Sequence, residues 1–273
     1  MQATWHSLYL PVADAAAVAA ALGRALTALG YRLYDPFPSG ADVGQPPWRQ
    51  RVRHFVAPPA EGWVRVLGQP QAAALPSLSA ALGTPLLHAW LDGDEAGLAV
   101  WSAAGRDDAP EALVPWLRAG RVAADVARAL AAAPPEEGAQ APGPGALPLP
   151  EELAALEQRV DRAQAARLSE RLARALFGKL GDQGGEQRAQ AQALLGGGSP
   201  WQTAAGRRLQ AAMACLAVPQ GWQRPAFEDV QAAYQAARAR QHNPHGLRLP
   251  GDDEALARLP QVLAYRPVYA GRR

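Results

Sequence analysis

The stretch from Trp48 to Ala103 constrains the fold more than any other part of the chain. It reads WRQRVRHFV, a Pro/Gly turn, WVRVLGQ, a short helical pattern, PLLHAWLD, an acidic turn and GLAVWSAAG. Runs rich in Val, Leu, Trp and Phe follow one another closely between Pro and Gly, which is typical of strands that share one sheet. The pattern predicts a helix over 71–82 and strands over 49–56, 63–67, 86–91 and 98–102.

The residues before this stretch predict a βαβ unit. We expect a strand over 5–12, a helix over 15–29 with Asp14 as its N-cap, and a strand over 31–34. A third helix is expected to begin at Pro110. The order resembles a split βαβ sandwich with an extra hairpin strand. The N-terminal part is therefore predicted to be a mixed sheet of about six strands with two or three helices.

A Pro- and Gly-rich segment, APPEEGAQAPGPGALPLP, marks the clearest boundary in the chain. Such a composition is typical of a linker. The patterns after it are helical. The predicted organisation is thus an α+β sheet domain over 1–133, a linker over 134–150 and a C-terminal helical domain over 151–273. The terminal YRPVYAGRR is expected to dock as a strand or arm, on this chain or on another.

Composition narrows the class of protein. The chain has 273 residues, 49% of them hydrophobic, so it can bury a sizeable core. Residues 1–147 carry 10 basic and 13 acidic side chains, and residues 148–273 carry 17 and 12, so the positive field lies in the second half. Cys215 is the one cysteine, which excludes an intramolecular disulfide and suits the reducing cytoplasm. No signal peptide and no membrane span are expected.

Familiar catalytic motifs are missing from the sequence. It contains no GxSxG, HExxH, GxxxxGK[ST], CxxC or GxGxxG pattern. The leading hypothesis is therefore a non-enzymatic cytoplasmic protein that acts as a macromolecule-binding or scaffold module, with another protein as the first expected partner and with no cofactor. The oligomeric state stays open.

Arginines on the predicted sheet support nucleic-acid binding as an alternative. Side chains that alternate along one strand lie on one face, and aromatic residues of the same parity interleave with them. A basic, aromatic sheet face is how some folds hold single-stranded nucleic acid, although it is also typical of a solvated sheet surface. Arginines of the C-terminal helices could add phosphate contacts. The candidates are Arg49, Arg51, Arg53, Arg65, Arg238 and Arg240.

An enzyme is the second alternative. His54 and His88 both lie in predicted strands, and each shares a face with apolar residues. With Asp92 they could form an interdomain site of histidine and carboxylate, in which histidine would act as an acid or base. A histidine in such a position is more often a hydrogen-bonded core residue.

A metal site is not predicted. His242 and His245 are three residues apart in QHNPHG and are the weak candidates for metal ligands. Pro244 and Gly246 indicate a turn there instead. The two histidines are then expected to end the preceding helix, where a cationic group suits the helix dipole.

Overall fold

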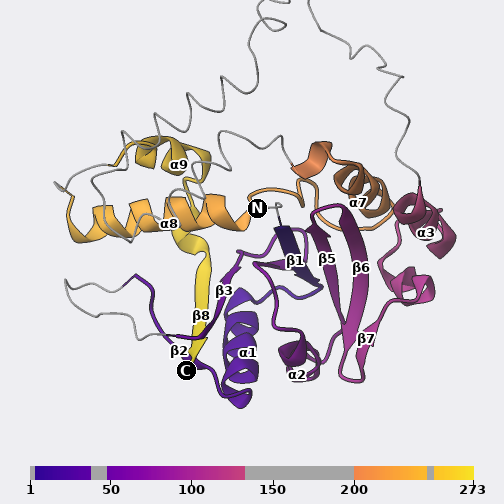
Figure 1. Ribbon diagram of the computed structural model, residues 1–273, viewed down its shortest axis with the longest axis horizontal. Coiled ribbons are helices and arrows are strands. Elements are labelled where there is room, and N and C mark those ends of the chain that lie inside the picture. Colours follow the sequence, from indigo (N-terminus) through magenta and orange to yellow (C-terminus); the bar gives the residue numbers. More distant parts are fainter. Residues whose placement is uncertain (1–3, 38–47, 133–199, 245–248) are drawn as a thin grey trace, which may run out of the picture.

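The computed structural model describes residues 4–37, 48–132, 200–244 and 249–273. Within these residues the chain forms an eight-stranded antiparallel sheet with helices on both faces (Figure 1). The predicted α+β class is therefore confirmed. The strands are β1 (Thr4–Leu10), β2 (Arg32–Leu33), β3 (Gln50–Val56), β4 (Val64–Leu67), β5 (Leu86–Asp92), β6 (Glu95–Ser102), β7 (Gly105–Asp107) and β8 (Arg266–Arg272).

The helices follow the apolar patterns of the sequence. They are α1 (Ala15–Ala28), α2 (Leu75–Leu82), α3 (Ala123–Ala131), α7 (Ala204–Ala214), α8 (Phe227–His242) and α9 (Asp252–Arg258). Short 3-10 helices span Ala72–Ala74, Pro110–Trp116, Pro200–Gln202 and Val262–Ala264.

The strand order is β2-β8-β3-β4-β1-β5-β6-β7, and every neighbouring pair is antiparallel. Alternation along this order makes β4 and β5 run in the same direction, with α2 joining them and β1 between them. This is a split βαβ unit. The strands β1 and β2, joined through α1, also run in the same direction but are not neighbours. The sheet is therefore antiparallel rather than mixed, because each parallel pair is separated by inserted strands.

The last strand, β8, lies between β2 and β3, far from its neighbours in sequence (Figure 1). It pairs with β3 from Gln50↔Arg272 to Val56↔Arg266. Its central residues Val268, Tyr269 and Ala270 are buried. The expected terminal arm thus docks on its own chain. Together with β7, which the sequence pattern did not indicate, β8 explains why the sheet has more than six strands.

Helix α1 covers one face of the sheet together with α2. The carboxylate of Asp14 accepts hydrogen bonds from the backbone N–H groups of Ala16 and Ala17, at 2.8 and 3.0 Å, and so caps the helix as predicted. Val18, Leu22 and Leu26 are fully buried, as their helical spacing requires. They share a core with strand residues Leu8, Leu10, Val56, Val64, Val66 and Leu86.

Two groups of helices cover the opposite face. At the β5–β6 end, α7 packs beside α3 and the 3-10 helix Pro110–Trp116, over Tyr9, Leu87 and Leu98 (Figure 1). Toward the β8 end, Val230 and Ala233 of α8 pack on Phe55, Leu67 and Tyr269. Residues from both halves of the sequence therefore build this layer.

The predicted division into two domains stays a prediction, because the linker and residues 151–199 lie outside the described residues. Helices α7 and α8 lie where the patterns after the predicted linker are helical. Both pack on the N-terminal sheet. In the part of the chain that the structure describes, no helix is both long enough and apolar enough to cross a membrane.

Candidate functional site

Arginine and aromatic side chains gather on the α8 face of the sheet, at the end formed by β2, β8 and β3. In register, Arg32 and Arg51 both lie opposite Gly271, and Arg53 lies opposite Tyr269. Alternation therefore places these arginines on the same face as Tyr269 and Phe55. We call Arg32, Tyr34, Trp48, Arg51 and Arg53 the arginine strip.

Two aromatic rings lie flat within the arginine strip. Trp48 covers Gly271 so closely that a Cβ at this glycine would come within 2.2 Å of the indole ring. Tyr34 stacks on Trp48 with ring centroids 5.8 Å apart and an interplanar angle of 26°. Both rings keep part of their surface exposed. The two rings therefore add partly exposed aromatic surface to the arginine strip.

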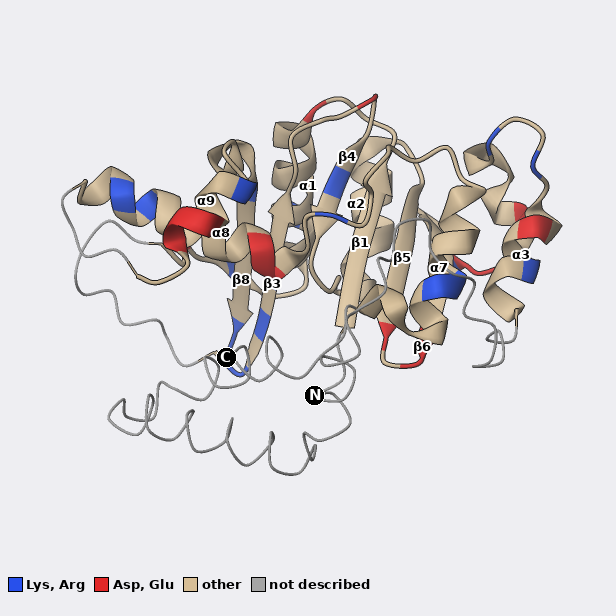
Figure 2. Ribbon diagram, turned by 90° about the horizontal axis from the view of Figure 1, so that it is seen from above, with Lys and Arg blue, Asp and Glu red and all other residues tan. Residues whose placement is uncertain are grey.

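The charges of the arginine strip are only partly offset by nearby carboxylates. The charge of Arg53 lowers the pKa of Glu228, in the first turn of α8, against the larger effect of desolvation, which raises it. Arg32, Arg51 and Arg53 are exposed, as is Arg49 just before β3, and none of the four forms an ion pair with a described residue. Figure 2 shows basic segments on β3 and at the end of β8. Desolvation raises the pKa of Tyr34, and the charges of Arg51 and Arg53 partly oppose it. The guanidinium carbon of Arg53 lies 5.7 Å from the ring of Phe227.

Arg65 shares this face but lies apart from the strip. It is opposite Tyr9 on β1, and the segment before α8 covers it. Its Nε donates to Ser7 Oγ and its Nη1 donates to the carbonyl oxygen of Arg224, both at 2.9 Å. The sequence predicted that four sheet arginines share one face. Of these, Arg49, Arg51 and Arg53 are exposed, whereas Arg65 is enclosed.

The helical candidates Arg238 and Arg240 do not reach the strip. The N-terminus of α8 lies at Arg53, and both arginines lie more than ten residues further along this helix, roughly 15–20 Å away at 1.5 Å per residue. Arg238 donates to the carbonyl oxygen of Phe37 at 3.5 Å, and Arg240 pairs with Asp253. Both side chains therefore support the packing of α8 against its neighbours.

His54 is fully buried on the α1 face of the sheet. Its Nδ1 lies 3.3 Å from the carbonyl oxygen of Leu67, and its Nε2 has no hydrogen-bond partner. Desolvation lowers the pKa of His54 to about 4, against a weaker opposing effect of the Leu67 hydrogen bond. The imidazole is neutral near pH 7 and is sealed from any substrate in this conformation.

His88 forms a pair with a histidine that the sequence reasoning did not single out. His6 Nδ1 lies 3.2 Å from His88 Nε2, so one ring donates a hydrogen bond to the other. Trp90 covers His88 with ring centroids 5.0 Å apart. Desolvation, and then the charges of His6 and Arg106, lower the pKa of His88 to about 3. The β1–β5 register that joins the two rings has no local sequence signal.

Asp92 does not complete a catalytic site with these histidines. It is exposed at the end of β5, and its charge raises the pKa of His6 while the larger effect, desolvation, lowers it. His54 lies on β3, three strand spacings from β5, or about 14 Å. No described carboxylate hydrogen-bonds His54 or His88. In the part of the chain that the structure describes, His54, His88 and Asp92 are therefore not brought together into one site.

The structure describes one of the two metal candidates. His242 is the last residue of α8 and is exposed. His245 lies outside the described residues. Among the residues that can be described, no group of three or more His, Cys, Asp or Glu side chains could hold a metal ion.

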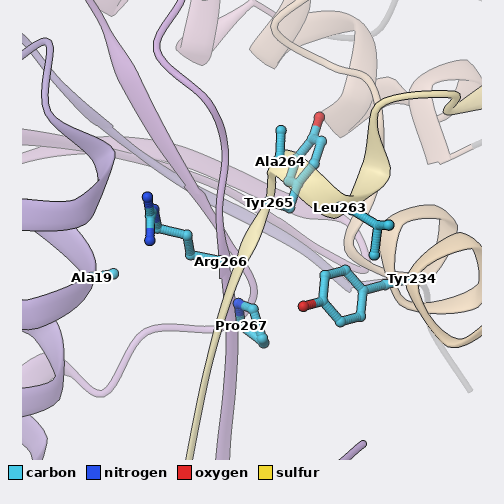
Figure 3. Close-up of a pocket in the computed structure, with 7 residues that line it drawn as sticks. All are labelled: Ala19, Tyr234, Leu263, Ala264, Tyr265, Arg266 and Pro267. Carbon is cyan, nitrogen blue, oxygen red and sulfur yellow. The ribbon is translucent and has the colours of Figure 1, made fainter. Parts of the chain in front are cut away.

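A hollow of about 460 Å³ lies between α1, α8 and the start of β8 (Figure 3). Arg266 extends from β8 toward Ala19, and Tyr234 points its hydroxyl group toward Pro267. Arg266 is exposed, and Leu263 is 43% exposed. Water can solvate the guanidinium group of Arg266 here, so an anion would gain little free energy by binding in the hollow.

Fold and surface together define an α+β protein with an antiparallel sheet and a basic, aromatic strip at one end. Tyr34 belongs to this surface although the sequence did not indicate it, because β2 and β3 meet only through β8. Comparison with known proteins adds no relative: no family model, no curated protein and no solved structure matches this chain.

Proposed function

We propose that this is a non-enzymatic binding protein that holds single-stranded nucleic acid on the arginine strip. The observation that carries the proposal is that exposed Arg51 and Arg53, which form no ion pair with a described residue, lie beside the stacked rings of Trp48 and Tyr34. Guanidinium groups contact phosphates, and exposed rings stack on bases whatever their sequence. The buried free Cys215 suits a reducing compartment such as the cytoplasm.

The chemistry of the strip favours a single strand over a duplex. A base must leave its stack to lie on Trp48 or Tyr34, and bases do so readily only in single strands. Stacking on a ring and pairing with a guanidinium group both act on any nucleotide. The proposal therefore predicts weak dependence on base sequence and strong dependence on salt.

Replacing Arg51 and Arg53 together by glutamine is expected to weaken binding of a labelled oligothymidylate. In fluorescence anisotropy, the slope of log K against log salt should flatten by about 0.7 for each phosphate that the variant no longer neutralises. Arg121→Gln is the matched control, because Arg121 is exposed near α3 and makes no described side-chain hydrogen bond or ion pair. This control should bind as the wild type does.

A loss in Arg121→Gln about half as large as the loss in the double variant would indicate attraction by overall charge alone, because the control removes one charge and the double variant removes two. No binding of any oligonucleotide at low salt would exclude nucleic acid as the ligand. The strip would then be the surface to test against acidic protein segments, which is the partner class that the composition first suggested.

A further inference from the structure

Arg65 lines a cavity of about 200 Å³ on the α8 face of the sheet. The cavity lies between β4, the turn after β3 and the segment that precedes α8. One water needs only ~10–15 Å³ of such space, so the cavity can hold a small organic molecule. Its walls are mainly aromatic and proline side chains, among them Tyr9, Pro58, Trp63, Trp222 and Tyr265.

The guanidinium group of Arg65 has an incomplete set of partners. Nε and Nη1 donate to Ser7 Oγ and to the Arg224 carbonyl oxygen. Nη2 is enclosed and has no hydrogen-bond partner, although other atoms of the side chain keep some exposure. Arg65 also lines the cavity, so a small movement of this guanidinium would bring its unpaired hydrogens to a carboxylate oxygen bound there.

No acidic side chain offsets this charge among the described residues. Arg65 takes part in no described ion pair, and the rings that surround it are those of Trp5 and Tyr9, at 5.5 and 5.9 Å. Desolvation lowers the pKa of Arg65, while Tyr9 and Tyr265 act weakly in the opposite direction. An enclosed cation without an anion is costly, and an anionic ligand would remove that cost.

We propose that this cavity binds a small organic carboxylate, whose charged group pairs with Arg65 and whose apolar body lies among Pro58, Trp63 and Trp222. One enclosed cation matches one negative charge better than the two charges of a phosphate. Arg224, which also lines the cavity, is exposed and adds a screened second charge. The site is separate from the arginine strip and does not depend on nucleic-acid binding.

Benzoate is the probe for a first test, with benzamide as its neutral counterpart and inorganic phosphate as the alternative anion. Isothermal titration calorimetry of the full chain should show one benzoate site and much weaker binding of the other two. Arg65→Met should lower benzoate affinity by roughly tenfold or more, as expected for the loss of a hydrogen bond to a charged group. Arg121→Gln, an exposed arginine outside both sites, should leave benzoate binding unchanged.

Thermal unfolding separates loss of the ligand site from loss of the fold. Without ligand, Arg65→Met should melt at or above the temperature of the wild type, because it removes an enclosed charge; benzoate should raise the melting temperature of the wild type alone. Arg65→Lys keeps the positive charge but lacks the planar pair of amino groups of a guanidinium. It should bind benzoate with intermediate affinity. Equal binding of benzoate and benzamide, stronger binding of phosphate, or undiminished binding by a folded Arg65→Met protein would each overturn the proposal.

Discussion

Removing residues 266–273 is expected to abolish the cooperative unfolding of the whole protein. These residues include β8, which is the sole partner of β2 and the outer partner of β3. Its Val268, Tyr269 and Ala270 are buried, and each large apolar side chain contributes about 1.5–3 kcal/mol on burial. The loss, with that of the β3–β8 hydrogen bonds, is comparable to the whole stability of about 5–15 kcal/mol that is usual for a domain.

The measurement is thermal unfolding followed by near-ultraviolet circular dichroism, in which packed tryptophans report tertiary structure. The truncated chain should show no sharp transition, whereas a chain that lacks only Arg273, which follows β8, should melt like the wild type. A truncated protein with an undiminished transition would mean that β8 is an accessory strand rather than part of the central sheet.

The second large expected effect is that acid destabilises the folded protein through His54. Its pKa is about 4 in the folded protein and 6.5 in the unfolded chain, so the unfolded state binds more protons between these values. The contribution of neutral His54 to the free energy of unfolding is complete above pH 6.5. It is lost as the pH falls toward 4, by up to ~1.4 kcal/mol per pH unit. Below pH 4 both states are protonated, and this contribution no longer changes.

Urea unfolding at a series of pH values tests this expectation with His54→Leu, which cannot take up a proton. The variant should lose the hydrogen bond to Leu67 at neutral pH, yet its free energy of unfolding should fall less steeply between pH 6.5 and pH 4. His242→Leu is the control, because His242 is exposed at the end of α8 and should keep the wild-type slope. Identical slopes in all three proteins would show that His54 is already protonated, or hydrated, in the folded state.

Local patterns predicted most of the described helices and strands. The cap at Asp14, the apolar stripe of α1 and the alternation in β3 all depend on residues within a few positions of one another. The strands over 49–56, 63–67 and 86–91 recur within one or two residues as β3, β4 and β5. Short-range periodicity suffices for these elements, because burial of one face selects the conformation that groups its apolar side chains.

The candidate surface was predicted less completely. The alternation of Arg49, Arg51 and Arg53 placed them on one face, but it could not show that Arg65 is enclosed while the other three are exposed. That difference arises because Trp222 and Arg224, from a distant part of the chain, fold over β4. The alternation of side chains also could not show that Tyr34 stacks on Trp48 or that His6 contacts His88, because these contacts depend on strand register.

The sequence by itself determined the α+β class, the strand and helix positions before residue 103 and the face on which each strand side chain lies. Only the tertiary structure decided that β8 lies between β2 and β3, and which arginine side chains are exposed to solvent. The physical reason is the range of the interactions. Alternation along a strand depends on near neighbours, whereas the exposure of a side chain depends on whichever distant segment buries its own apolar residues against that face.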